Sequence, residues 1–141
     1  MTLEQRIKWL QAGSAMVVVF GIVIALGAHP STNGIVVFLA DVMIWPLDGA
    51  QTGEASEMRF LSAVSGGIMV GWGICLWMLA TAGLREAPQL SRRIILLSIG
   101  TWFVLDSAGS LVAGVPLNVA GNVLFLLIFI IPLRAFQTQP A

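Results

Sequence analysis

Four uninterrupted apolar stretches constrain the fold of this chain more than any other feature. They cover residues 11–28, 60–84, 93–115 and 117–136. Crossing about 30 Å of hydrocarbon at about 1.5 Å per residue takes roughly 20 residues. Because a backbone in lipid must satisfy its own hydrogen bonds, each stretch is expected to be a helix. The sequence therefore predicts an all-α membrane protein, with residues 1–141 as a single integral membrane domain built as a bundle of four transmembrane helices.

Composition supports the membrane class and excludes several functions. Hydrophobic residues make up 57% of the chain and charged residues 10%, whereas soluble domains are about 45–50% apolar and about 25% charged. The formal net charge is zero, so no basic field indicates a nucleic-acid partner. The single cysteine, Cys75, excludes an intramolecular disulfide. No CxxC, P-loop, HExxH or GxSxG pattern is present, so we expect no enzyme and no metal site, while a cofactor stays open.

A fifth apolar stretch, residues 35–45, is too short to span and contains Asp41. Pro46 follows it and would end a helix there. We expect a short interfacial helix on the outer side of the membrane.

Basic residues are distributed unevenly about the four stretches. One side carries six basic residues, Arg6, Lys8, Arg85, Arg92, Arg93 and Arg134, and the other carries Arg59 beside the acids Asp41, Asp48, Glu54 and Glu57. This bias predicts a multi-pass membrane protein with both termini in the cytoplasm. The outer acids match no calcium loop, so a solvated acidic loop is expected rather than a cation site.

The first stretch also allows a different interpretation. Basic residues, an apolar run and the small tripeptide Ala25-Leu26-Gly27 together describe a secretory signal as well. Its core is longer than that of a usual signal, so we expect a retained first span.

Two connections have clear turn chemistry. Pro88 should break the helix between the second and third stretches, and Ser91 is a candidate cap for the next helix. Residues 114–117 (Gly-Val-Pro-Leu) form a turn short enough to make the third and fourth stretches an antiparallel hairpin.

Small residues recur every fourth position in the second stretch, at Ala63, Gly67, Gly71 and Cys75. Such a stripe lets helices in lipid approach closely. We expect it to pack against the first span or against another subunit, which includes a second copy of the chain.

Asp106 is an ionisable residue inside the third apolar stretch. A charge there costs about 3 kcal/mol on insertion scales, so it should face protein or water. Helical spacing places Ser110 on its face, while Asn118 and Asn122 share a face of the fourth stretch. Ser62 and Ser65 of the second stretch reach comparable depths. These residues predict a polar pocket with Asp106 near the midplane.

Two roles for Asp106 stay open at this point. It is either a structural hub that bonds its neighbours, or a site for a proton, cation or polar solute that arrives from outside. The first role fits a non-enzymatic accessory or assembly subunit, whose partners are the bilayer and other membrane proteins. The second fits a proton- or small-solute-handling transporter centred on Asp106.

The acidic outer loop leads into Glu57-Met58-Arg59-Phe60 and then into the Gly-rich segment SAVSGGIMVGWG. In this arrangement the chain resembles small bacterial inner-membrane proteins of the broad DoxX-like type. The resemblance implies four helices over nearly the whole chain and a place in the bacterial inner membrane. It implies no redox role, and the segment WFVLDSAGS has no counterpart in that group.

Overall fold

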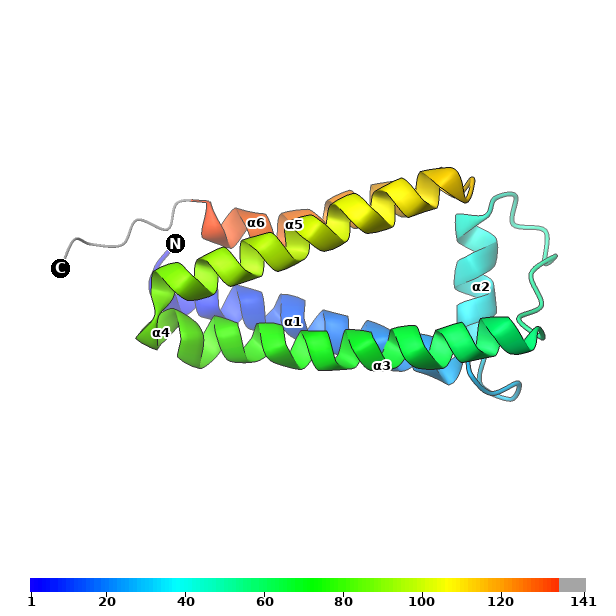
Figure 1. Cartoon of the computed structure of the whole chain (residues 1–141), viewed down its shortest axis with the longest axis horizontal. Coiled ribbons are helices and arrows are strands. Elements are labelled where there is room, and N and C mark those ends of the chain that lie inside the picture. Colours follow the sequence, from blue (N-terminus) through cyan, green and yellow to red (C-terminus); the bar gives the residue numbers. More distant parts are fainter. Residues whose placement is uncertain (135–141) are drawn as a thin grey trace. The chain divides into compact units, whose positions relative to one another are not determined.

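The computed structural model describes residues 1–134, in which all regular structure is helical (Figure 1). The helices in chain order are α1 (Leu3–Leu26), α2 (Gly34–Met43), α3 (Ser56–Met78), the π-helix η1 (Leu79–Gly83), α4 (Leu84–Glu86), α5 (Pro88–Val112) and α6 (Pro116–Leu133). Four helical segments are long and apolar enough to cross a membrane: α1, the continuous run Ser56–Glu86, α5 and α6. The prediction of an all-α chain with four helices long and apolar enough to cross a membrane is therefore confirmed.

The helix ends differ from the predicted spans where polar residues extend an apolar helix. α1 begins at Leu3 rather than at residue 11. Thr2 and Gln5 form a reciprocal capping box there. The backbone N–H of Gln5 donates to Thr2 Oγ1 (3.2 Å), and the backbone N–H of Thr2 donates to Gln5 Oε1 (2.8 Å). Residues 135–136 of the predicted fourth span lie outside the described residues.

Pro88 separates α4 from α5, as predicted, by occupying the first position of α5. The expectation that Ser91 caps this helix was wrong. The helix begins three residues before Ser91, and the Ser91 side chain is buried within the first turns.

Two compact units make up the chain. One comprises residues 1–15 together with the chain from residue 74, and the other comprises residues 16–73. We call them the terminal unit and the central unit. Residues of α1 and α3 belong to both.

In the terminal unit, a proline inside α6 creates a carbonyl that another helix satisfies. Pro132 has no N–H to donate to the carbonyl of Ile128 one turn earlier. The indole Nε1–H of Trp9 donates to that oxygen instead (2.9 Å). This hydrogen bond joins the N-terminal part of α1 to α6. It can form because Pro132 leaves the Ile128 carbonyl without its usual backbone donor.

Arginines bind the last carbonyls of α6. Arg6 donates to the carbonyl of Pro132, and Arg92 Nε donates to that of Leu133 (3.0 Å). Guanidinium groups suit a helix C-terminus because its carbonyls lack intrahelical donors and carry partial negative charge. Arg85 also pairs with Glu4 (3.1 Å), so the start of α1, the start of α5 and the end of α6 lie at one end of this unit.

A short π-helical turn, η1, lies between α3 and α4. Its backbone bonds run from i to i+5 in place of i to i+4. The Thr81 hydroxyl within this turn bonds the carbonyls of Trp77 (2.9 Å) and Met78 (3.2 Å) in the preceding turn.

In the central unit, α1 and α3 meet backbone to backbone at glycines. A Cβ on Gly66 would overlap the backbone nitrogen of Ala25 and lie 2.6 Å from the carbonyl of Gly21. A Cβ on Gly21 would lie 2.8 Å from the nitrogen of Val70. These positions accept no side chain, which is the small-residue packing expected of helices in lipid.

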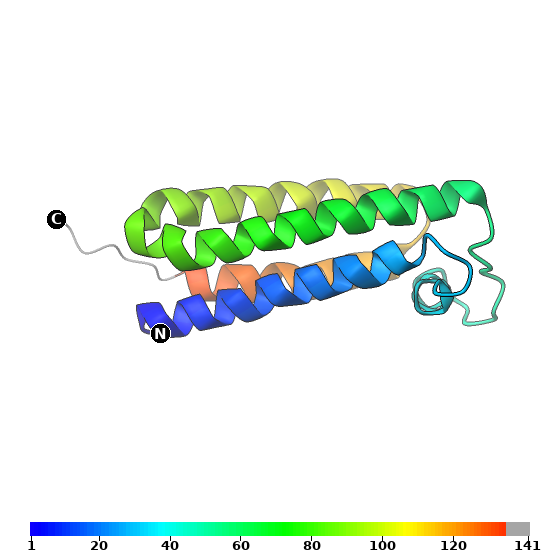
Figure 2. The ribbon, with the colours of Figure 1, turned by 90° about the horizontal axis from the view of Figure 1, so that it is seen from below.

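The short helix α2 runs across the direction of α3 (Figures 1 and 2). Its Asp41 is buried at 6% exposure, and the carboxylate accepts the amide N–H of Gly49 at 3.0 and 3.2 Å. Asp41 was expected in a solvated acidic loop. It instead fixes the loop after α2, because Gly49 has a left-handed φ of +72° that presents its N–H to the helix.

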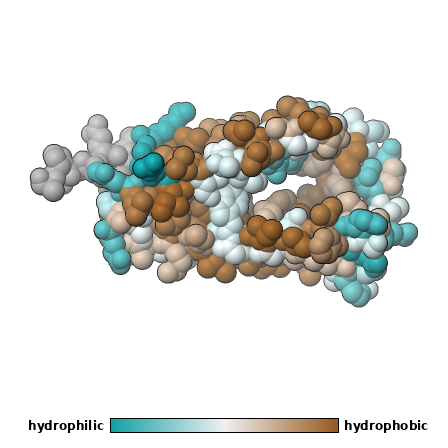
Figure 3. Space-filling view, in the orientation of Figure 1, coloured by the Kyte–Doolittle hydropathy of each residue, from teal (hydrophilic) through white to brown (hydrophobic). Residues whose placement is uncertain are grey.

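Large hydrophobic side chains remain on the surface of the helices, among them Val112, Leu105, Leu124 and Phe60. Figure 3 shows hydrophobic residues over the helices in view. A surface of this kind is far more apolar than that of a soluble protein of this size.

Candidate functional site

The α5–α6 hairpin places three polar side chains around one oxygen atom of Asp106. Asn118 Nδ2 and Asn122 Nδ2 each donate to Asp106 Oδ1 at 2.7 Å. Ser110 Oγ donates to the same oxygen at 3.3 Å. The structure thus brings together the Asp106, Ser110, Asn118 and Asn122 that helical spacing places on facing surfaces.

The tight turn explains why these residues meet. Gly114 has a φ of +75°, which only glycine adopts without strain, and it ends α5 two residues before α6 begins. Pro116 then occupies the first position of α6. With the turn fixed, Asn118 and Asn122 are set one helical turn apart opposite the face of Asp106 and Ser110.

Further bonds close the cluster. Asn118 Nδ2 also donates to Ser110 Oγ (2.8 Å), and Asn122 Nδ2 donates to Ser107 Oγ (3.2 Å). Sequence reasoning missed Ser107. The available signal was its spacing of three residues from Ser110, which places both hydroxyls toward the same neighbouring helix.

Burial differs within the cluster. Ser107 and Asn122 are buried, at 8% and 5% exposure, whereas Asp106, Ser110 and Asn118 are half-buried. Asp106 Oδ2 has no hydrogen-bond partner among residues 1–134. One carboxylate oxygen is therefore occupied by the hairpin itself, and the other remains available.

An aromatic group lies one turn along α5 from Asp106. The rings of Trp102 and Phe125 meet edge to face with centroids 5.0 Å apart, and Phe125 lies 5.4 Å from Phe129. These rings join α5 to α6 beside the polar cluster and add contact that edge-to-face geometry favours.

Ser62 and Ser65 belong to the central unit, whereas Asp106 belongs to the terminal unit. Ser62 is buried at 8% exposure, whereas Ser65 is exposed. The polar path that would join them to Asp106 stays a prediction.

The predicted packing stripe of α3 is exposed at all four positions, Ala63, Gly67, Gly71 and Cys75. A Cβ on Gly67 or Gly71 would meet nothing within 4 Å. Gly66, on a neighbouring face of the same helix, contacts α1. Packing of the stripe against another subunit stays a prediction.

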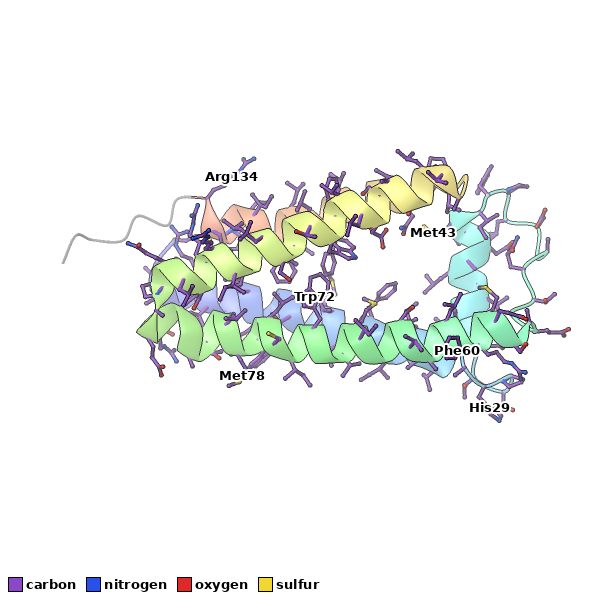
Figure 4. All side chains as sticks on the ribbon, in the orientation of Figure 1. His29, Met43, Phe60, Trp72, Met78 and Arg134 are labelled. Atoms are coloured by element: carbon purple, nitrogen blue, oxygen red, sulfur yellow. The ribbon has the colours of Figure 1, made fainter. Side chains whose placement is uncertain are left out.

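His29 lies in the turn after α1 and is exposed (Figure 4). Its Nδ1 accepts the amide N–H of Ser31 (3.1 Å), which gives it a local role in the turn. Among residues 1–134, no group of three or more His, Cys, Asp and Glu side chains is placed to hold a metal ion.

The Asp106 cluster is thus the site at which ionisable, amide and hydroxyl groups converge in the terminal unit. Its chemistry is hydrogen bonding to a carboxylate, with one oxygen closed by the hairpin and one open. The resemblance to DoxX-like proteins stays a prediction from the residues quoted above. No family model, curated protein or solved structure matches this chain.

Proposed function

We propose that this chain is a non-enzymatic accessory or assembly subunit of a bacterial inner-membrane complex, in which Asp106 is a structural hub. The observation that carries the proposal is the closure of Asp106 Oδ1 by three side chains from its own hairpin. Hydrogen bonds between helices in a membrane each contribute about 0.6–2 kcal/mol. The bonds from Asn118 and Asn122 join α6 to α5, and they supply a reason for an intramembrane acid without a transported substrate.

The proposed topology has four spans in a bundle, both termini in the cytoplasm, and α2 at the outer surface. Its support comes from the basic residues. Arg6, Arg85 and Arg92 contact groups at one end of the terminal unit, and a cytoplasmic end rich in arginine follows the positive-inside tendency. Alkaline phosphatase fused after Arg134 should be inactive, and a fluorescent protein fused there should fluoresce. The reverse pattern would overturn this topology.

The subunit role is tested by mild-detergent extraction from the source membrane and native mass spectrometry. We expect a complex with a defined second chain or a second copy. Gly67→Ile and Gly71→Ile should lower the fraction of chain found in the complex, because the larger side chains would displace a partner that packs on these glycines. Within the chain itself, a Cβ at either position meets no atom within 4 Å. Ile68→Val, on an exposed neighbouring position, is the control. A bare monomer would remove the support for an accessory subunit.

A second candidate function is proton or small-solute transport centred on Asp106. The observation that favours it is the unpartnered Oδ2 of a half-buried acid. Asp106→Asn keeps one oxygen acceptor but removes the titratable group. If proteoliposomes carry a measurable proton or solute flux that Asp106→Asn abolishes, Asp106 is a transport site. If Asp106→Asn changes thermal stability and leaves flux unchanged, it is a hub.

A further inference from the structure

A pocket of about 300 Å³ lies within the central unit. Its apolar wall includes Val36, Val37 and Ala40 of α2 and Met58 of α3, and the loop of residues 50–55 encloses it. The volume is at the lower end of the range of roughly 300–1,000 Å³ that small-molecule pockets occupy. All of its lining residues lie between Gly27 and Ser62.

Two contacts hold the loop against α2 and so give the pocket a fixed shape. Asp41 accepts the amide N–H of Gly49. Gly53, with a φ of +62°, lies so close to α2 that a Cβ would be 2.8 Å from Val37 and 3.2 Å from Asn33. The pocket wall therefore depends on a buried acid and on a glycine that no other residue replaces without strain.

Ser62 contributes a hydroxyl that the protein does not use. It lines the pocket at 8% exposure and has no hydrogen-bond partner among residues 1–134. By contrast, Ser14 bonds the carbonyl of Leu10 one turn back (2.8 Å). Among the described residues, every fully buried side-chain nitrogen or oxygen has a hydrogen-bond partner. Since Ser62 Oγ has none, it is not fully buried, and it is accessible from the pocket that Ser62 lines. An oxygen of a molecule bound in the pocket would accept a hydrogen bond from this hydroxyl in place of water.

The charges of the lining select the ligand class. No Lys, Arg or His lines the pocket, and its one ionisable lining residue, Glu54, is exposed. A carboxylate or phosphate would therefore meet no cation and would face a negative group. The exposed position of Glu54 leaves its charge solvated, so it provides little attraction for an ammonium group.

We propose that this pocket binds a small uncharged amphiphile, whose apolar body lies against Val36, Val37 and Ala40 and whose oxygen accepts a hydrogen bond from Ser62. The site is independent of the Asp106 cluster and of the subunit role proposed above.

The test uses photolabelling of the full chain in lipid nanodiscs with a diazirine-bearing octanol. The octylamine and octanoic acid that carry the same diazirine serve as charged probes of matched length. We expect saturable labelling within residues 33–62, mapped by peptide mass spectrometry and displaced by excess 1-octanol. The alcohol should label this segment several-fold more than the acid or the amine.

Variants then assign the labelling to the pocket. Ser62→Ala should lower the apparent affinity about five-fold, the effect of one lost neutral hydrogen bond. Ser65→Ala, three residues away, exposed and outside the lining, should leave it unchanged. Ala40→Phe should fill the pocket and remove the labelling. Ala50→Phe fills it from the loop and replaces Ala40→Phe if that variant elutes as aggregate.

Three outcomes would overturn the proposal. One is labelling that rises linearly with probe and is not displaced by 1-octanol, as for bulk lipid. Another is equal labelling by the acid or by the amine. The third is labelling that persists unchanged in Ser62→Ala and in a folded pocket-filling variant.

Discussion

The central unit brings α1 and α3 together at glycines, whereas the terminal unit joins its helices through polar side chains. At Gly21 and Gly66 the two backbones touch and leave no room for a methyl group. In the terminal unit, Trp9, Arg6 and Arg92 donate to carbonyls of α6, and Asp106 accepts from three donors. The backbone contact at Gly21 and Gly66 makes the central unit sensitive to added volume there. The terminal unit is in addition sensitive to the loss of hydrogen bonds between its helices.

The largest effect is expected from added volume in the central unit. Gly66→Ala should lower the free energy of unfolding by about 3 kcal/mol, because the new methyl group meets the backbone of α1 and no flexible side chain can yield. Reversible unfolding in mixed detergent micelles measures it.

Gly67→Ala is the matched control, with the same change one residue away and open space around it. It should change the free energy of unfolding by less than about 0.5 kcal/mol. An equal loss of stability in Gly67→Ala would mean that the close approach at Gly66 is not its cause, since helix propensity favours alanine at both positions.

The polar terminal unit should respond to Asp106→Ala with a loss of about 2 kcal/mol in the free energy of unfolding, because three donors lose their shared acceptor. Asn118 and Asn122 keep Ser110 and Ser107 as partners, which limits the loss. Ser110→Ala removes a 3.3 Å bond to Asp106 and the acceptor of Asn118, so it should cost less than Asp106→Ala. If Ser110→Ala lowered the free energy of unfolding more than Asp106→Ala, Ser110 rather than Asp106 would be the main residue of the cluster.

The loop after α2 tests whether polar contacts matter in the central unit as well. Gly49→Ala should cost about 1–2 kcal/mol of loop stability, since its φ of +72° is unfavourable for any residue with a Cβ. Asp41→Ala removes the acceptor of the Gly49 amide and should speed its hydrogen exchange about five-fold or more. Unchanged exchange at residues 44–55 would show that the loop is held by packing alone.

The smallest effect is expected at the orphaned carbonyl of α6. Trp9→Phe should cost about 1 kcal/mol in the free energy of unfolding, since the indole N–H is lost and the ring is largely kept. Pro132→Ala restores a backbone donor to Ile128, so Trp9→Phe should cost less in that background. Strict additivity in this double-mutant cycle would mean that Trp9 contributes only by packing.

The sequence predicted the helices well where length and spacing carry the information. Apolar length alone locates four spans, because a bilayer demands it. The start of α1 at Leu3 was missed, since its capping box lies in polar residues before the apolar run. The π-helical turn at Leu79–Gly83 has no compositional signal and was also missed.

The candidate site was predictable for a related reason. Asp106, Ser110, Asn118 and Asn122 lie on two regular helices joined by a three-residue turn, so helical periodicity fixes their relative heights. The pocket beside α2 was not predictable. Its shape depends on an irregular loop with left-handed glycines at positions 49 and 53, and no period relates a loop residue to its neighbours.

The glycines of α3 show the limit of pattern reasoning within a single helix. A four-residue repeat drew attention to Gly67 and Gly71, yet Gly66 makes the contact with α1. Spacing identifies which residues share a face. It does not identify which of two small-residue faces a neighbouring helix selects.

The π-helical turn η1 divides the long helical run Ser56–Glu86 into two parts that are out of phase. One extra residue per turn rotates everything that follows by about 100° relative to a continuous α-helix. The faces of α3 therefore cannot be extended past Met78 by counting in fours. Inserting a single residue into an α-helix would produce a turn of this kind, and Thr81 bonds two carbonyls of the preceding turn there. A homologue one residue shorter between positions 79 and 83 would keep both helical parts and present a different face to the residues around α4.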